Sequence, residues 1–374
     1  MRRTRVWFRV AALLVLLVIC CQPASAAPAW QVVLLHPSSE LETSALGVSG
    51  ASAVGYVRDF SGVARPALWA NSSLPITLPG PADTWALGID GTTIVGQARV
   101  TVDAVVWQGE MHNLAVLEPS GVSSSSALAV FGATEVGSMV IGGAPHAAAW
   151  AGSAETVRDI HPVVAWGSAL RAIDATGEAG DLIPVVHGST HAALWQGTAE
   201  SVVDLHPAGA YASSAQAISN GRQGGYVQFE RDGPAHAALW SGTPDSYVDL
   251  TPSFVWTAGI NGMDGGVQAG VGVPTGSSGF HALVWFGSAD SCLDLHSFLS
   301  SDYTKSEARA VDIDEFGTIR VVGYAYNENY YLPNGTYYPR NEAMMWVLVP
   351  EPSSLAALAA GLAGLAGVRT QRRR

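Results

Sequence analysis

Short apolar runs separated by polar, glycine-bearing turns extend along most of this chain. In one clear example, four strand-like runs occupy residues 169–174, 179–186, 190–195 and 201–205. Short runs with such turns between them are typical of an antiparallel meander. Between its two ends the chain shows no convincing helical period, so the pattern predicts an all-β fold.

This four-run unit is repeated. Its best copies begin at four histidines and read HAAAWAGSAETVRDIHP (His146), HAALWQGTAESVVDLHP (His191), HAALWSGTPDSYVDLTP (His236) and HALVWFGSADSCLDLH (His281). Seven tryptophans mark the copies, and they are 38, 43, 45, 45, 45 and 61 residues apart: Trp69, Trp107, Trp150, Trp195, Trp240, Trp285 and Trp346. Such a period indicates stacked or radially arrayed copies of one supersecondary unit.

The first run of each copy contains a small residue, then Val or Ile, then usually a short polar residue. The series is Gly47-Val48-Ser49, Gly88-Ile89-Asp90, Ala129-Val130-Phe131, Ala172-Ile173-Asp174, Ala217-Ile218-Ser219, Gly259-Ile260-Asn261 and Ala310-Val311-Asp312. Strands that converge on a common axis are crowded there, and a small residue at a fixed position relieves the crowding. The series therefore predicts that these runs are the innermost strands of a ring.

The two ends of the repeated region complete each other. The last copy has only three runs, ending at Trp346, whereas residues 30–37 (WQVVLLHP) resemble a fourth run with no first three before it. We therefore predict a seven-bladed β-propeller in residues 27–348, closed by the N-terminal strand, since closure removes exposed sheet edges. The alternative, an open β-solenoid, needs capping repeats and leaves the unmatched run unexplained.

Residues 1–26 have the pattern of a secretory signal peptide. Four arginines precede an apolar segment at residues 10–19, and Ala24-Ser25-Ala26 forms a cleavage site. Cleavage there leaves Cys292 as the only cysteine, so we expect no internal disulfide.

The C-terminal residues 349–374 carry a second signal. Pro350, Glu351 and Pro352 precede an apolar segment at residues 355–368, and the chain ends in an arginine cluster that includes Arg372, Arg373 and Arg374. In order and position these parts resemble the PEP-CTERM sorting signal of Gram-negative bacteria. The resemblance implies recognition by an exosortase-type membrane protease, cleavage near the triplet, and delivery to the cell surface or an exopolysaccharide matrix.

The apolar segment predicts a short C-terminal hydrophobic helix. As a helix, residues 355–368 would rise about 21 Å, which is less than the roughly 30 Å of a bilayer core. This length suits a transient inner-membrane anchor, with the arginines on the cytoplasmic side. Whether the anchor is cleaved or retained stays open.

The net charge changes once both ends are removed. Eight of the 19 basic residues and one of the 31 acidic residues lie in the two signals, which leaves 11 basic and 30 acidic residues, or about −19. This charge argues against nucleic acid, and against an anionic polysaccharide held by charge alone.

The repeat itself resembles the HAF-type extracellular repeat (His-Ala-Phe-Leu-Trp, then Asp-Leu) of secreted bacterial proteins. Here Ala replaces the Phe in the best copies, and the copies at Trp69, Trp107 and Trp346 lack the His. The resemblance supports the architecture and implies no defined chemistry.

Two sets of histidines recur at the blade period: His146, His191, His236 and His281, and His36, His161, His206 and His296. Histidines invite a metal or catalytic interpretation, but equivalent positions on successive blades cannot easily converge on one ion. We expect the first set to bond within each blade to Asp159, Asp204, Asp249 and Asp294, and we predict no metal site. The seven tryptophans are expected to fill the gaps between blades, with an exposed, sugar-stacking ring as the alternative.

One insertion breaks the repeat. Residues 324–339 hold six of the eleven tyrosines, and tyrosine is favoured in binding loops because it offers a flat apolar face with a polar tip. The candidate binding residues are Tyr326, Asn327, Tyr330, Tyr331, Tyr337 and Tyr338. The alternative is an extended hairpin whose tyrosines merely cover the blade.

No linear motif of an enzyme is present, and no cofactor is predicted. We therefore favour a secreted binding or structural protein whose partner is an exopolysaccharide or another surface protein. The alternative is a polysaccharide-active glycosidase or lyase with its site at the propeller channel, using carboxylates such as Asp90, Asp174 and Asp312.

Overall fold

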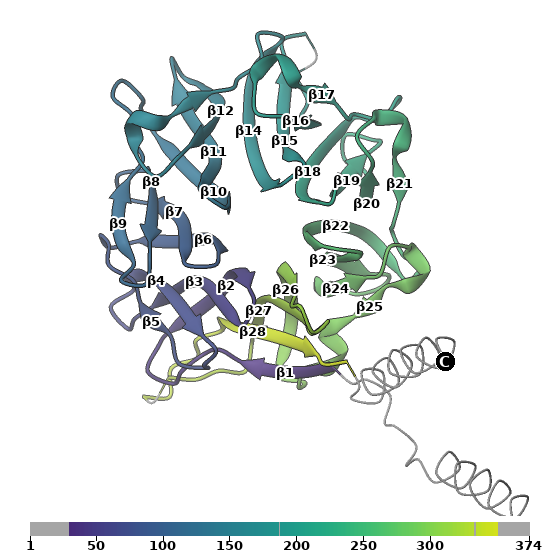
Figure 1. The fold of residues 1–374 in the computed structure, drawn as a ribbon. Helices are drawn as coiled ribbons and strands as arrows, with labels where there is room; N and C mark the ends of the chain where they lie inside the picture. The colour runs from purple at the N-terminus through teal and green to yellow at the C-terminus, as the bar shows by residue number, and fades with distance from the viewer. Residues whose placement is uncertain (1–29, 187, 333, 351–374) are drawn as a thin grey trace, which may run out of the picture.

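The chain folds into seven antiparallel four-stranded sheets arranged in a ring (Figure 1). A computed structural model describes residues 30–350, apart from 187 and 333. Tight turns join the first and second strands, and left-handed glycines such as Gly50 (φ 55°) and Gly91 (φ 56°) make these turns without steric cost. The predicted all-β propeller is confirmed.

We number the sheets as blades 1 to 7 and give the strands of each from the channel outward. Blade 1 contains β2 (Glu42–Ser49), β3 (Ser52–Arg58), β4 (Ala64–Ala70) and β5 (Ile76–Thr77). Blade 2 contains β6 (Thr84–Asp90), β7 (Thr93–Ala98), β8 (Asp103–Gln108) and β9 (Asn113–Val116). Blade 3 contains β10 (Ser125–Phe131), β11 (Thr134–Ile141), β12 (Ala144–Trp150) and β13 (Arg158–Asp159).

The next three blades are built alike. Blade 4 contains β14 (Ala165–Asp174), β15 (Gly177–Pro184), β16 (His191–Trp195) and β17 (Val203–Asp204). Blade 5 contains β18 (Ala212–Ser219), β19 (Arg222–Gln228), β20 (Ala235–Trp240) and β21 (Val248–Asp249). Blade 6 contains β22 (Val255–Asp264), β23 (Val267–Pro274), β24 (His281–Trp285) and β25 (Leu293–Asp294). Short 3-10 helices lie beside the outer strands: Ala154–Thr156, Ala199–Ser201, Pro244–Ser246, Ala289–Ser291 and Leu295–Phe298.

Blade 7 joins the two ends of the described chain. It contains β26 (Tyr303–Ile313), β27 (Ile319–Asn327), β28 (Arg340–Leu348) and, as its outermost strand, β1 (Trp30–Leu34). Strand β1 runs antiparallel to β28, with Val32 opposite Trp346. The prediction that the N-terminal strand closes the ring is therefore confirmed.

The core lies between blades. Each of the seven repeat tryptophans is at most 1% exposed, and each packs in a cluster that includes residues of the preceding blade. Trp195, for example, lies with Leu170 of its own blade and with Val136 and Ala147 of blade 3. The expected packing role of the tryptophans is confirmed, and an exposed tryptophan ring at these positions is excluded.

One prediction about the inner strands is wrong. In blade 6 the equivalent of the small residue is Gly262, opposite Ala269, and not Gly259. Strand β22 is longer than most inner strands. Its Gly259-Ile260 pair matches the small-residue-then-Val/Ile pattern, but it lies three residues before the true equivalent position. The predicted signal peptide and the predicted C-terminal hydrophobic helix lie outside the described residues.

Candidate functional site

Every inner strand contains a β-bulge at the same place. The pairing with the second strand skips one residue immediately before the small residue of each blade. The seven skipped residues are Leu46, Leu87, Leu128, Arg171, Gln216, Asn261 and Arg309, and they are the seven residues that line a central cavity of about 170 Å³. A bulge re-aims a side chain, and here it aims one side chain from each blade into the channel.

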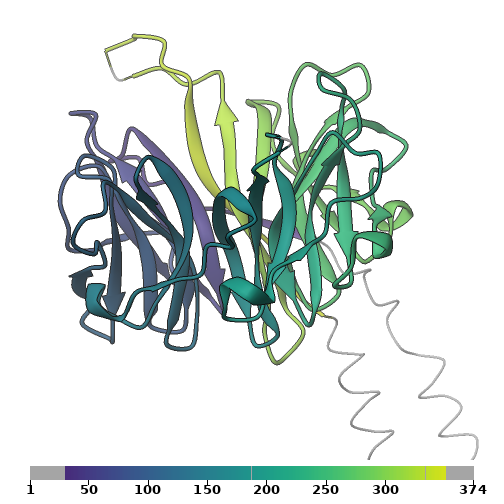
Figure 2. The same ribbon diagram turned by 90° about the horizontal axis from the view of Figure 1, so that it is seen from above.

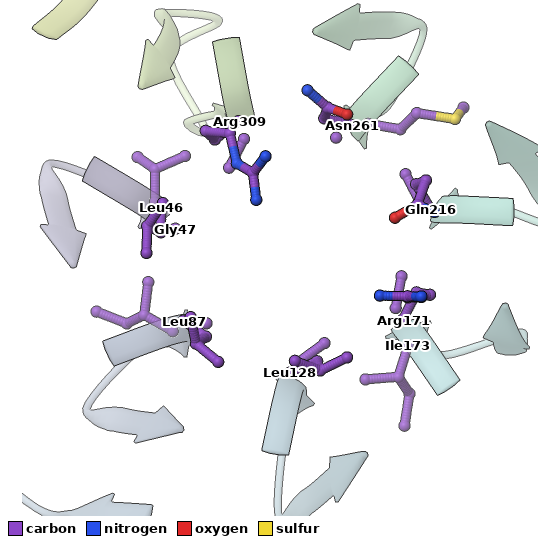
Figure 3. A pocket seen from close by; sticks show the side chains of 18 of the residues that line it. Leu46, Gly47, Leu87, Leu128, Arg171, Ile173, Gln216, Asn261 and Arg309 are labelled. Atoms are coloured by element: carbon purple, nitrogen blue, oxygen red, sulfur yellow. The ribbon is translucent and has the colours of Figure 1, made fainter. Parts of the chain in front are cut away.

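The channel has two different halves (Figure 3). Blades 1 to 3 contribute three leucines, whereas blades 4 to 7 contribute two arginines, a glutamine and an asparagine. One wall is therefore apolar and the opposite wall is polar and partly cationic.

The polar wall is held by two carboxylates, Asp181 on the strand next to that of Arg171 and Glu307 on the same strand as Arg309. Arg171 donates from Nε to Asp181 at 2.8 Å, and Ser214 also donates to Asp181. Arg309 donates to Glu307 at 2.7 Å, and Glu307 also accepts from Asn261 at 3.1 Å. Both arginines are thus fixed at one edge of the guanidinium.

A pocket of about 400 Å³ lies beside this polar wall, between blades 5, 6 and 7. Apolar residues form most of its lining, and Tyr226, Asn261, Thr257 and Glu307 add polar groups. Gly259 is part of the lining, and a Cβ placed there would meet only Tyr226, at 3.7 Å. The pocket therefore exists partly because Gly259 carries no side chain.

Two lining residues of the pocket contact β27 of blade 7, the strand that leads into the insertion. Phe280 lines the pocket and packs edge-on against Tyr324 of β27, whose hydroxyl donates to Glu307 at 2.6 Å. Lys305 lies over the rings of both Phe280 and Tyr326, at 6.0 and 5.2 Å. Burial and the adjacent Glu307 raise the pKa of Tyr324, so its phenol stays protonated and can donate.

The insertion joins β27 to β28 and projects beyond the other blades (Figure 2). We call residues 328–339 the tyrosine hairpin, because Tyr331 and Tyr337 form a β-bridge. Their rings lie 5.5 Å apart and are 58% and 49% exposed. The start of β22, the end of β23 and the hairpin share one end of the meander, so the hairpin and the pocket open on the same face.

The structure divides the six candidate binding residues. Tyr331 and Tyr337 are exposed, whereas the other four are partly buried. Arg340 stacks on the ring of Tyr330 at 3.3 Å, and Asn327 donates to Glu342 at 3.2 Å. Partial burial and these contacts fit the covering role for four of the residues, and only Tyr331 and Tyr337 present exposed rings.

The three aspartates named for the enzyme alternative each accept a hydrogen bond from a backbone amide of the next blade. Asp90 accepts from the Gly132 amide and Asp174 from the Asn220 amide, both at 2.7 Å. Asp312 bonds to the Gly50 amide, and burial raises its pKa. Ser49, Ser219 and Asp264 make the same contact to the amides of Gly91, Gly265 and Ile313. These residues form a ring of links on the face opposite the hairpin, with Phe131 at the one position of the series that is apolar.

The repeated histidines also link strands and blades. In blades 3 to 6 the first set bonds through Nδ1 to the predicted aspartates, each at 2.8 Å, as expected. His161 and His206 bond to Ser168 and Ser213 of the following blade at 2.8 Å, and each stacks on the histidine of the first set in its own blade. Across residues 30–350, with 187 and 333 left aside, no group of three or more His, Cys, Asp or Glu side chains is placed to hold a metal ion.

Cys292 is buried in the interface of blades 5 and 6. Burial, followed by the nearby Asp294, raises the pKa of its thiol to about 12. A thiol in that state is a poor nucleophile at neutral pH.

The sequence analysis did not predict the channel wall or the pocket. The signal was present, since the residue before the small residue is leucine in three blades and polar in four once blade 6 is aligned on Gly262. Because the sequence analysis aligned blade 6 on Gly259, it placed Asn261 at the end of the inner strand, with Ser49 and Asp90, and not at the bulge position. The pocket left no linear signal, because its lining comes from three blades.

Residues 348–374 match the PEP-CTERM protein-sorting motif. The predicted sorting signal is therefore confirmed, and it implies export, sorting to the surface of a Gram-negative bacterium, and processing by an exosortase, which is a membrane protein. No helix within the described part of the chain is long and apolar enough to cross a membrane. The resemblance of the body to HAF-type repeats stays a prediction.

No curated protein matches the chain in sequence. Among solved structures, a puromycin hydrolase is similar with a TM-score of 0.52 and 13% identity, over 79% of this chain and 51% of that one. The chain thus spans about half the length of that protein. The β-propeller domain of the Trilobed protease from Pyrococcus furiosus (TM-score 0.49, 8% identity, 82% and 94% covered) and a lectin from Burkholderia pseudomallei (0.44, 14%, 80% and 95%) are also similar. At these identities the likeness to the hydrolase shows the propeller fold alone.

Proposed function

We propose that this exported propeller is a carbohydrate-binding protein of the cell surface or extracellular matrix, and that it binds its ligand on the face that carries the tyrosine hairpin. The observation that carries the proposal is the pocket of about 400 Å³ whose lining residues Phe280 and Glu307 contact Tyr324 of β27, the strand that leads into the hairpin. This volume is within the range of small-molecule sites, roughly 300 to 1,000 Å³.

The lining suits one or two sugar units. Phe280, Val271 and Val273 offer an apolar wall for the C–H face of a pyranose, while Glu307, Asn261 and Tyr226 offer acceptors and a donor for hydroxyl groups. Burial raises the pKa of Tyr226, so its hydroxyl keeps its proton. A longer chain would extend from the pocket toward Tyr331 and Tyr337, whose exposed rings can stack on further units.

A glycan array probed with the purified protein tests the proposal. The pocket variant Gly259→Leu fills the cavity from a position where a Cβ meets no clash, and we expect it to lose at least tenfold in affinity. Its matched control is Gly266→Leu in the same blade, on the opposite face, where a Cβ meets nothing within 4 Å. Equal binding by the two variants would contradict the pocket assignment.

A second variant tests the hairpin. Asn327 and Arg340 are paired residues, so residues 328–339 can be replaced by a two-residue Asn-Gly turn without changing the register. We expect weaker binding of long glycans and little change for a disaccharide. If every interaction survives, the hairpin has a covering role only.

The enzymatic alternative predicts that the bound glycan is shortened. The contacts of Asp90, Asp174 and Asp312 with neighbouring blades support a structural role for these three carboxylates. Mass spectrometry of the glycan after prolonged incubation distinguishes the two functions, since a binding protein returns the glycan at its original length.

A further inference from the structure

The two halves of the central channel complement one kind of molecule. The apolar half consists of Leu46, Leu87 and Leu128, and the polar half of Arg171, Gln216, Asn261 and Arg309 (Figure 3). A ligand that fits both halves needs an apolar face on one side and charged or polar groups on the other.

The polar half of the channel has hydrogen-bond donors and acceptors that no described residue uses. Arg171 uses only Nε and Arg309 only Nη1 for their carboxylate partners, so within the described chain each keeps terminal N–H groups without an acceptor. Gln216 and Asn261 donate through their amide nitrogens to Ser214 and Glu307. Their carbonyl oxygens have no donor among the described residues. Two cationic donors therefore flank two neutral acceptors.

The neighbouring acids neutralise the charge of the two arginines but leave part of their N–H donors unused. Asp181 already accepts from Arg171 and Ser214, and Glu307 already accepts from Arg309, Asn261 and Tyr324. Each arginine–carboxylate pair is therefore close to neutral, and a ligand would be held by the remaining directional hydrogen-bond donors rather than by excess positive charge. The open guanidinium groups remain able to bind a second carboxylate, which is the anion that suits their fork of donors.

We propose that the channel binds a single uronate unit, either as a free sugar or as the end of an acidic glycan. Its carboxylate bonds to Arg171 and Arg309, its hydroxyls donate to the oxygens of Gln216 and Asn261, and its C–H face packs on the three leucines. The cavity of about 170 Å³ is smaller than sites for drug-sized ligands, roughly 300 Å³ and above, which favours one unit. This inference goes beyond the proposed function. Asn261 lines both cavities, but neither arginine lines the pocket of blades 5 to 7, so the arginine variants test the channel separately.

Calorimetric titration of the purified protein with D-galacturonate, D-galactose and sulfate tests the class of ligand. We expect galacturonate to bind, galactose to bind at least tenfold more weakly because it lacks the carboxylate, and sulfate not to bind measurably because it cannot use the leucines. Binding of trigalacturonate as well would indicate a chain end as the source, and binding of the free sugar alone a monomer. Both of these outcomes support the proposal, whereas equal affinity for galactose or for sulfate overturns it.

The double variant Arg171→Gln/Arg309→Gln tests the residues. Glutamine already occupies this bulge position in blade 5, so the substitutions suit the local backbone, and the single variant Arg309→Gln serves if the double one does not fold. We expect at least a tenfold loss of galacturonate affinity. The control Arg65→Gln removes an arginine from blade 1, outside the channel, and is expected to bind like the unchanged protein. Unchanged affinity of a folded channel variant overturns the proposal.

Discussion

The outer rim and the central channel are built from the same seven repeats, but they differ in how uniform those repeats are. At the rim, blades 3 to 6 repeat one histidine–aspartate bond at 2.8 Å each time. In the channel, equivalent bulge positions carry leucine in three blades and four polar side chains in the others. Packing favours the same contacts in successive blades, as blades 3 to 6 show, whereas binding a ligand without sevenfold symmetry requires differences between blades. The comparison therefore associates the rim with stability, and it supports the channel and the hairpin face as the places of the recognition proposed above.

The largest expected effect is at the tryptophans between blades. Trp195 is fully buried, whereas Trp256 is 60% exposed. We expect Trp195→Ala to lower the free energy of unfolding by about 3 to 5 kcal/mol because it leaves a cavity, and Trp256→Ala to change it by less than about 0.5 kcal/mol. Urea unfolding measures both, and a similar cost for the two variants would contradict the distinction between core and surface.

The next effect is a loss of stability at acid pH. Burial, with the nearby Arg340, lowers the pKa of His36 to about 4, and burial also lowers the pKa values of His161 and His296. Unfolded histidine has a pKa near 6.5, so below that pH the unfolded chain takes up protons that the folded chain does not. Stability should therefore fall as the pH drops from 6.5 toward 4, by up to about 3 kcal/mol from His36 alone. Unfolding curves of His36→Gln should show a shallower decline of stability between pH 6.5 and 4. An equally steep decline would contradict His36 as a source of the acid sensitivity.

A smaller effect is expected at a single rim bond. Removing the contact between His191 and Asp204 should cost about 1 kcal/mol, the usual contribution of one hydrogen bond. A double-mutant cycle with His191→Ala and Asp204→Ala isolates the contact. A coupling energy near zero would mean that the repeated pair adds nothing to stability.

The smallest effect is a gain. Phe131 is 43% exposed and occupies the position where six other blades place a serine or aspartate that bonds to the next blade. Phe131→Asp should add the missing link, to the Ala175 amide, and raise the free energy of unfolding by about 0.5 to 1 kcal/mol. Thermal unfolding of Phe131→Asp is compared with that of Phe131→Ala, which removes the exposed ring without adding a bond. A gain in Phe131→Asp alone indicates the new hydrogen bond.

Periodic features were predictable from the sequence, and features that depend on a single blade were not. Trp346 and the unmatched run at Trp30 were sufficient to predict the closing strand, because each blade must have four strands. The histidine–aspartate bonds followed from their fixed spacing. The pocket could not be predicted, because Tyr226, Gly259 and Phe280 meet only through the curvature of the ring. The partial burial of Tyr330, in contrast to Tyr331 and Tyr337, involves Arg340, which stacks on its ring and leaves no signal in the local sequence pattern.

Amide hydrogen exchange with and without the best-binding glycan of the array tests the central claim most directly, since it reports every blade at once. We predict slower exchange in the bound state at residues 257–259 and 271–273 and in the tyrosine hairpin, with no change at the outer strands Arg158–Asp159, Val203–Asp204 and Val248–Asp249. Protection confined to those outer strands, with none in blades 5 to 7 on the hairpin face, would contradict the claim.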